Sequence, residues 1–325
     1  MNADDILKKI ESLATGKGSD IQVLKELDSC GLILAPGEDC IQYKERLLKL
    51  FASIIKFNED LEENKKIKLF DFLDLDVANR ITPEIMQEAA LINKKFYAFT
   101  IDWIPGFFMN KSLGLLWGGC AMTFPDNNMS LFLIRGSFAK KRQWLFYKRD
   151  ELLAHELCHI ARTPVKDIVY EEFFAYKLSP SAFRRYLGNC FRSASDALFF
   201  IIPFFMLLGS QAVQLFLYPP LPVYPFWIIT VIYPAFLLIR NQIARKFYFK
   251  AELNLKKAGL PTAQYILFRC SKAEIQTIAA FSKDILGLKE WLAKQANIYL
   301  HWQIIYERFM SEEAITEIFP EFESF

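Results

Sequence analysis

Apolar residues concentrate in one stretch of the chain, from Ala197 to Ile239, where 43 consecutive residues include no Asp, Glu, Lys, Arg or His. As a helix, the part from Ala197 to Tyr218 would span about 33 Å, enough to cross a hydrocarbon layer of about 30 Å. A second stretch, Phe226 to Ile239, is long enough to cross this layer only when its start is counted from near Leu221. The helical pattern is broken between them by Pro219, Pro220, Pro222 and Pro225. We expect a transmembrane hairpin at residues 191–240; the alternative is a helical pair buried in a large soluble core.

Basic residues flank this stretch on both sides. Lys and Arg collect on the cytoplasmic side of membrane proteins, so both ends of the hairpin and most of the chain are expected to face the cytoplasm. The flanking residues are Arg184, Arg185 and Arg192 before the hairpin and Arg240, Arg245, Lys246 and Lys250 after it. The first residues, MNADDILKKIESL, lack the apolar segment of a signal peptide.

Helical spacing of apolar positions dominates the rest of the chain. A cap, a proline and an acid at Thr82-Pro83-Glu84 predict a helix that runs to about Asn93, and Ser271 with Glu274 matches a capping box. Further helices are expected at Asp4–Ser12, Glu38–Phe57, Lys140–Ala161 and Lys289–Phe309.

Residues 96–137 have a different pattern, rich in aromatic and β-branched residues. Three segments read as strands: Phe96–Trp103, Leu113–Phe124 and Met129–Arg135. Pro125 to Asn128 looks like the turn of a hairpin. We therefore expect a predominantly α-helical α+β fold with a small antiparallel sheet, packed on the helix that follows it.

Composition narrows the classes of function. The 39 basic and 37 acidic residues give a net charge of +2, which offers no electrostatic reason to expect a nucleic-acid partner. A hydrophobic content of 53% excludes intrinsic disorder. The six cysteines are scattered without a CxxC pair and read as reduced thiols: Cys30, Cys40, Cys120, Cys158, Cys190 and Cys270.

Two of the three histidines fall in one HExxH motif, formed by His155, Glu156 and His159. Four residues apart on a helix, both imidazoles lie on one face and can reach one Zn²⁺. The Glu156 carboxylate is then placed to take a proton from water activated by the metal. The plain alternative is a pair of ordinary surface histidines.

A catalytic zinc needs a third protein ligand and an open fourth position. Suppose that residues 163–166 form a tight turn into an antiparallel helix. The residue opposite His159 is then as many residues after the turn as His159 is before it. Both Glu171 and Glu172 satisfy this condition, so the geometry does not choose between them.

The pattern His155-Glu156-x-x-His159 followed by Glu172-x-x-Ala175 resembles the gluzincin zinc metallopeptidases. The resemblance covers residues 96–185. It implies that His155, His159 and Glu172 bind zinc, that Glu156 is the general base, and that Glu171 is the alternative ligand or a supporting residue. A more distant resemblance is to membrane-embedded peptidases of the prenyl-protein-protease and HtpX type, which usually have Asp where this chain has Tyr176.

In such enzymes the strand above the active-site helix holds the substrate as an added strand. The matching segment is Leu113–Phe124, and the resemblance makes Trp117, Gly118, Gly119 and Cys120 the substrate-binding residues. The glycine pair would let a peptide backbone approach closely, and an equally good interpretation is a bulge or bend.

Other residues carry weaker hypotheses. His301, Tyr170 and Tyr176 are candidates for stabilising the transition state, and packing is the preferred interpretation for each. Cys158 is expected in the core. The basic and aromatic residues at 140–149 would rest on lipid headgroups or form a solvated helix face.

The sequence therefore predicts an integral membrane zinc metallopeptidase that faces the cytoplasm, with peptide or protein substrates and the lipid bilayer as partners. The expected regions are an N-terminal helical region at 1–94, a metallopeptidase-like core at 95–190, the hairpin at 191–240, and a C-terminal helical region at 241–325. One alternative is a membrane-tethered metal-binding scaffold without catalytic activity, and another is a membrane structural protein without metal.

Overall fold

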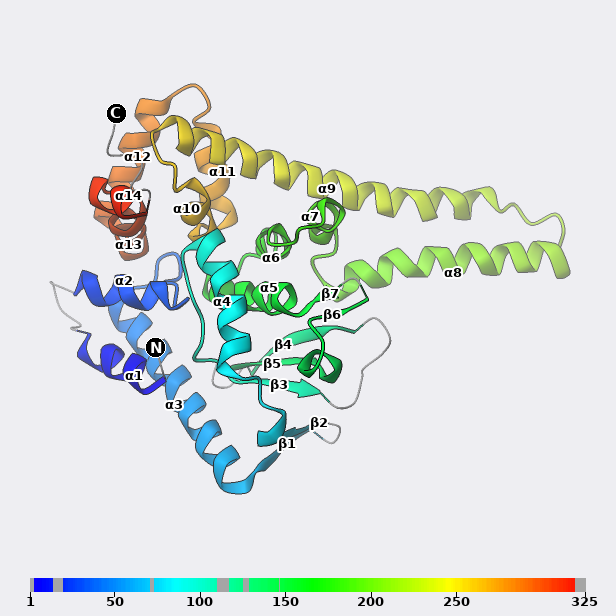
Figure 1. The fold of residues 1–325 in the computed structure, drawn as a ribbon. Coiled ribbons are helices and arrows are strands. Elements are labelled where there is room, and N and C mark those ends of the chain that lie inside the picture. The colour runs from blue at the N-terminus through cyan, green and yellow to red at the C-terminus, as the bar shows by residue number, and fades with distance from the viewer. Residues whose placement is uncertain are drawn as a thin grey trace.

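The computed structural model describes residues 3–13, 20–70, 73–109, 117–124, 129–145 and 147–318. Helices account for most of the chain, and a small sheet lies beneath the central helix α5 (Figure 1). This confirms the predominantly helical α+β class.

The helices and strands have the following bounds. The α-helices are α1 (Ala3–Ser12), α2 (Ile21–Ser29), α3 (Cys40–Asn64), α4 (Pro83–Tyr97), α5 (Arg149–Arg162), α6 (Glu171–Lys177), α7 (Ala182–Leu187), α8 (Ala194–Phe216), α9 (Tyr224–Lys257), α10 (Ala263–Arg269), α11 (Lys272–Ala280), α12 (Ile285–Ile298), α13 (Leu300–Phe309) and α14 (Glu312–Ile318). The strands are β1 (Lys66–Phe70), β2 (Leu73–Asp76), β3 (Gly106–Met109), β4 (Gly119–Thr123), β5 (Ser130–Arg135), β6 (Gln143–Trp144) and β7 (Tyr147–Lys148). Short 3₁₀ turns are η1 (Val77–Asn79), η2 (Gly136–Ala139), η3 (Thr163–Val165) and η4 (Gly188–Cys190).

The sheet beside α5 has the strand order β3-β5-β4. β4 and β5 are antiparallel as predicted, with Thr123 opposite Ser130, and the expected turn at 125–128 lies outside the described residues. The prediction of a purely antiparallel sheet is wrong, because β3 runs parallel to β5. The strand expected at 96–103 is also wrong: Tyr97 ends α4, the strand is Gly106–Met109, and the irregular chain between them buries apolar residues such as Phe99 and Trp103.

The helix expected from Lys140 begins only at Arg149. Instead β6 and β7 pair as antiparallel strands, with Gln143 opposite Lys148, and Leu145 after β6 has a φ of 51°. The basic and aromatic residues before Arg149 therefore do not form a helix face. Phe146, within this segment, lies outside the described residues.

Helix capping explains why the other predicted helices form where expected. Asp39 and Gln42 form a capping box at the start of α3, and Ser271 with Glu274 forms the predicted one at α11. The single helix expected at 289–309 is divided, since Tyr299 adopts an extended conformation between α12 and α13.

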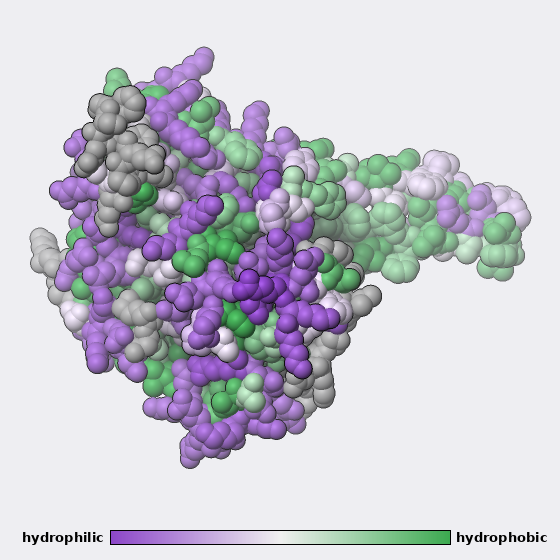
Figure 2. Space-filling view, viewed as in Figure 1, coloured by the Kyte–Doolittle hydropathy of each residue, from purple (hydrophilic) through white to green (hydrophobic). Residues whose placement is uncertain are grey.

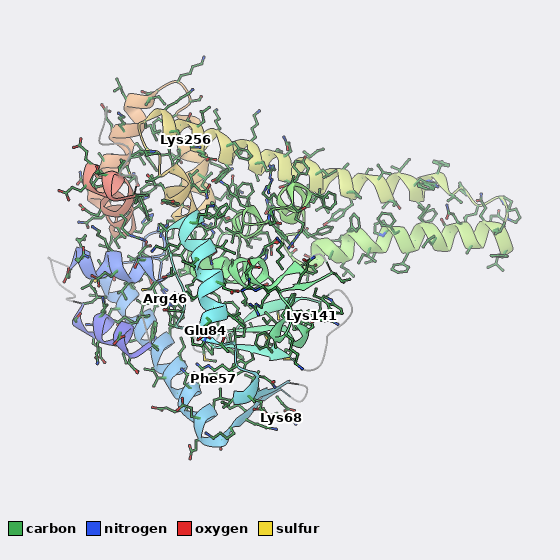
Figure 3. The ribbon with its side chains drawn as sticks, in the orientation of Figure 1. Arg46, Phe57, Lys68, Glu84, Lys141 and Lys256 are labelled. Carbon is green, nitrogen blue, oxygen red and sulfur yellow. The ribbon has the colours of Figure 1, made fainter. Side chains whose placement is uncertain are left out.

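One hydrophobic core joins the regions expected at 1–94, 95–190 and 241–325. Phe57, labelled in Figure 3, extends from α3 to the sheet, where its ring lies 6.0 Å from that of Phe107 in β3. Tyr97 stacks on Phe268 of α10 at 4.1 Å. α5 packs between α4 and β4 inside this core, so the HExxH helix is held from two sides, including the sheet on which it was predicted to pack.

α8 and α9 leave the body side by side as a long hairpin (Figure 1). Both helices are long and apolar enough to cross a membrane. Their side chains form the hydrophobic surface that projects from a largely polar body in Figure 2. Only 11% of the most apolar stretch of α8 and 17% of that of α9 is buried. The alternative of a helical pair buried in a soluble core is therefore contradicted.

Polar contacts join the two helices of this hairpin. The Thr230 hydroxyl donates a hydrogen bond across the pair to the Pro203 carbonyl at 3.1 Å. At the end next to the body, the Asp196 carboxylate accepts hydrogen bonds from Arg240 at 2.6 Å and from the Tyr233 hydroxyl at 3.1 Å. These contacts fix the hairpin where it meets the body.

Candidate metal centre

α5 places the two motif histidines on one face. Its first turn carries Asp150 and Glu151, whose negative charges are favourable at a helix N-terminus. Leu153, Ala154 and Leu157 fill the opposite, fully buried face. One helical turn separates His155 from His159, so their Nε2 atoms lie 3.2 Å apart.

Glu172 of α6 approaches both imidazoles. Its carboxylate oxygens lie 3.6 Å from the Nε2 atom of His155 and 3.7 Å from that of His159. Ligands about 2.05 Å from a tetrahedral zinc are about 3.3 Å from one another, so the observed separations suit three corners of such a site. Among the described residues, His155, His159 and Glu172 are the only group of this kind.

The connection between α5 and α6 fixes the position of Glu172. η3 follows α5 directly, and Lys166 then adopts a left-handed conformation with a φ of 53°. The Asp167 carboxylate accepts a hydrogen bond from the Val169 N–H at 2.9 Å and one from the fully buried Arg162 at 3.3 Å. These hydrogen bonds hold the short connection in one conformation, in which the chain reverses direction and α6 packs against α5.

Glu171 has a different place from its neighbour. Its Oε1 atom lies 3.2 Å from Nδ1 of His159, the ring nitrogen that faces away from the cluster. A carboxylate at this position holds the imidazole orientation and leaves Nε2 free for a metal. Of the two acids, Glu172 is the one that joins both histidines in a group that could hold a metal ion, and Glu171 contacts the other ring nitrogen of His159.

Glu156 lies under the edge of the sheet. It is only 8% exposed, and its Oε2 atom accepts a hydrogen bond from the Ala121 N–H of β4 at 2.9 Å. Burial raises the pKa of this carboxyl group above its usual value, against the charge of His159 and the Ala121 hydrogen bond. A buried carboxylate with a raised pKa is suited to exchanging protons near neutral pH.

β4 is an edge strand of the described sheet. The Gly118 carbonyl accepts a hydrogen bond from the Arg135 N–H of β5, and the Phe124 N–H donates one to the carbonyl of Met129, just before β5. Because this pattern alternates along an antiparallel pair, the backbone groups of Gly119 and Ala121 point away from β5. The Ala121 N–H donates to Glu156, and the Ala121 carbonyl with both Gly119 groups faces the side of β4 on which no strand of the described residues pairs with it. An extended peptide can pair with these groups.

The four predicted substrate-binding residues differ in their position relative to the cavity of the metal cluster. Cys120 lines a cavity of about 400 Å³ together with both histidines and Glu172, whereas Trp117 is not among the residues that line it. A Cβ atom at Gly119 would lie 2.9 Å from the Leu133 carbonyl, so this glycine lets β4 pair closely with β5. Gly118 faces Leu152 and Tyr147. The bulge interpretation is wrong for β4, because its register is continuous from Gly119 to Thr123.

Tyr176 packs against a candidate ligand. Its ring centroid lies 4.6 Å from that of His155, at 72° to it. Behind the ring is Gly188, where a Cβ atom would lie only 2.1 Å from the ring atoms. Burial and the charge of Glu172 raise the pKa of Tyr176 to about 12. The tyrosine therefore stays neutral and supports the His155 ring. Tyr176 was a candidate from the sequence, but no sequence pattern predicted that its ring needs a glycine at position 188.

Burial and charge set the protonation of the cluster. Burial, the charge of His159 and that of Arg184 hold the pKa of His155 well below its usual value, so this imidazole is neutral. Burial lowers the pKa of His159, but the Glu171 hydrogen bond and the Glu172 charge outweigh it and raise that pKa to about 9. Burial raises the pKa of Glu172 to about 7. A bound cation would compete with protons for these groups.

Three other candidates have packing roles. His301 is buried, with Nε2 2.8 Å from the Glu274 carboxylate of α11. The buried Tyr170 hydroxyl donates to the Ala244 carbonyl at 3.1 Å. Cys158 is fully buried in the core, as predicted. None of these three lines the cavity of the metal cluster.

Comparisons of the chain with protein-family models, with curated proteins and with solved structures found no match. A function for this chain therefore rests on the geometry and chemistry of the site.

Proposed function

We propose that the chain is a membrane-anchored zinc metallopeptidase of the gluzincin type that hydrolyses peptide bonds on the cytoplasmic side. The observation that carries this proposal is the convergence of four groups. Two imidazole Nε2 atoms and the Glu172 carboxylate lie within 3.2–3.7 Å of one another, and the buried Glu156 lines the same cavity beneath an edge strand.

The donor set suits zinc better than the common hard cations. Two imidazoles and one carboxylate form the ligand set of many catalytic zinc sites, whereas Ca²⁺ and Mg²⁺ prefer oxygen ligands throughout. Among the described residues no fourth His, Cys, Asp or Glu joins the cluster, so the protein leaves one tetrahedral corner unused. When bound, zinc lowers the pKa of water to about 7 and polarises a carbonyl group.

The chain's own residues supply positioning and proton transfer. The backbone groups of Gly119 and Ala121 hold an extended peptide along β4. Glu156, buried and linked to Ala121, accepts the proton of the attacking water and then donates it to the leaving amine. Glu171 and Tyr176 keep the two imidazoles in place.

The hairpin of α8 and α9 provides the anchor. Its exposed apolar surface is the kind that requires lipid or protein to cover it. The basic residues at both of its ends support a cytoplasmic position of the body, because Lys and Arg collect on that side of membrane proteins.

The test is peptide cleavage by purified wild-type protein and by Glu156→Gln. The substitution keeps the three ligands and removes the base, so we expect unchanged zinc content and loss of cleavage. Glu290→Gln is the control, because Glu290 is exposed on α12. Equal cleavage by wild type and Glu156→Gln would refute the mechanism. Zinc binding without cleavage by the wild type would favour the metal-binding scaffold, and the absence of metal would favour a structural membrane protein.

A further inference from the structure

A second, larger cavity adjoins the metal cluster. It has a volume of about 870 Å³ and extends along α7 to Ser193 and Ala194, where α8 begins. Three residues line both this cavity and that of the metal cluster: Glu172, Tyr176 and Arg192. The two cavities therefore meet at a candidate metal ligand, and a peptide cleaved at the metal has room to continue into the larger one.

Among the described residues, Arg192 is the only Lys or Arg that lines the cavity of the metal cluster. Its guanidinium donates to the carbonyl oxygens of Asn189 and Arg240, each at 3.4 Å. Nearby arginines are neutralised: Arg184 pairs with Glu151 at 2.7 Å, and Arg240 pairs with Asp196 at 2.6 Å. Among the described residues no carboxylate lies within 4.0 Å of the Arg192 guanidinium, so no ion pair neutralises its charge.

The position of Arg192 is fixed by its backbone. Its N–H donates to the Asp196 carboxylate at 2.8 Å, and Asp196 is itself held by Arg240 of α9. Asn241 of α9 donates to the Tyr186 carbonyl at 2.6 Å and so holds the end of α7 nearby. The segment that carries Arg192 is therefore anchored to α9 beside both cavities.

The larger cavity is apolar beside this charge. Phe183, Leu187 and Phe191 line it, and Phe183 is 72% exposed. A cation next to such a surface recognises a carboxylate with an apolar neighbour.

We propose that Arg192 binds a carboxylate of the peptide substrate, and that Phe183, Leu187 and Phe191 contact an apolar side chain next to it. The carboxylate is either the C-terminus of the peptide or an Asp or Glu side chain. This proposal rests on the peptidase function proposed above and adds the substrate class: peptides with an acidic group beside an apolar residue, on the α7 side of the cleaved bond.

The test uses four versions of one cleavable apolar peptide, which end in a free carboxylate, an amide, Glu-amide or Gln-amide. We would measure kcat/KM for wild type, Arg192→Gln, Arg192→Lys and Arg185→Gln. Arg185 is the matched control, because it also donates to carbonyl oxygens, those of Ser179 and Pro180, but lines neither cavity.

Wild type should cleave carboxylate-bearing peptides roughly tenfold to a hundredfold better than their neutral partners, the range of a hydrogen bond to a charged group. Arg192→Gln should abolish this preference, Arg192→Lys should keep part of it, and Arg185→Gln should leave it unchanged. The free-acid pair and the Glu/Gln pair show which carboxylate Arg192 binds.

The proposal would be overturned by equal cleavage of charged and neutral peptides by wild type, or by an equal loss for all four peptides in Arg192→Gln. It would also be overturned if Arg192→Gln weakened binding to vesicles with anionic lipid and left the peptide preference intact. Failure of the peptidase function is a separate result, in which wild type cleaves no peptide faster than Glu156→Gln. In that case the affinities of Glu156→Gln and of Glu156→Gln/Arg192→Gln for the charged and neutral peptides still show whether Arg192 binds a carboxylate, because this titration needs no cleavage.

Discussion

Replacing Glu171 and Glu172 separately by alanine tests the roles that the structure gives them. Glu172 lies within 3.6–3.7 Å of both imidazole Nε2 atoms, whereas Glu171 contacts only Nδ1 of His159, at 3.2 Å. Both side chains are partly exposed, 36% for Glu171 and 29% for Glu172. Neither change should leave a large cavity, so differences should reflect metal binding.

The expected magnitudes differ. Structural zinc sites bind with roughly 10–16 kcal/mol, which is about 2.5–4 kcal/mol for each of four ligands. Glu172→Ala should therefore weaken zinc binding by about 70- to 800-fold. Loss of a group that orients a ligand typically weakens binding by about 10- to 100-fold, or about 1.4–2.7 kcal/mol, and this is the expectation for Glu171→Ala.

Competition with a chromophoric chelator measures both affinities, and thermal melting of the metal-free proteins controls for folding. Glu172→Ala should bind zinc more weakly than Glu171→Ala, which in turn should bind it more weakly than wild type. The reverse order, or no change on loss of Glu172, would refute the assignment of the third ligand.

Three further predictions concern stability. Gly188→Ala should lower the free energy of unfolding by about 1–3 kcal/mol in denaturant titration, because its Cβ would lie 2.1 Å from the Tyr176 ring; an unchanged midpoint would contradict this contact. Burial alone would raise the pKa of Glu274, but the hydrogen bonds from His301 and Ser271 and the charge of His301 outweigh burial and lower this pKa. The ionised carboxylate therefore stabilises the fold at pH values above the unfolded pKa of about 4.3. Glu274→Gln should therefore lower Tm at pH 7, with a smaller difference only below about pH 4; an equal loss at both pH values would exclude this linkage. Asp28→Ala removes the buried carboxylate that pairs with Arg269 at 2.8 Å and should lower the free energy of unfolding by about 3–5 kcal/mol, and a loss below 1 kcal/mol would show that the pair does not join α2 to α10.

Local patterns predicted the parts of the fold that local forces decide. The HExxH spacing placed His155 and His159 on one helix face because that geometry needs only the helical period. The capping box at Ser271 and the proline at the start of α4 marked helix starts correctly, since caps satisfy nearby backbone groups. The apolar run from Ala197 to Ile239, broken by prolines, predicted the helical hairpin because the length and hydropathy of a segment are local properties.

Contacts between distant segments decided what the sequence could not predict. Aromatic residues at 96–103 suggested a strand, but Phe99 and Trp103 are buried by other elements without joining the sheet. The parallel pairing of β3 with β5 joins residues that no local pattern relates. Symmetry about the turn could not separate Glu171 from Glu172, because the turn at Lys166 and the Arg162–Asp167 contact set the rotation of α6.

The most direct measurement is a zinc-edge anomalous diffraction map of the purified protein, supported by X-ray absorption. It should show one zinc ion bound by Nε2 of His155, Nε2 of His159 and the Glu172 carboxylate, with a non-protein oxygen as the fourth ligand. A protein side chain in the fourth position, or zinc bound elsewhere or not at all, would contradict the proposed peptidase.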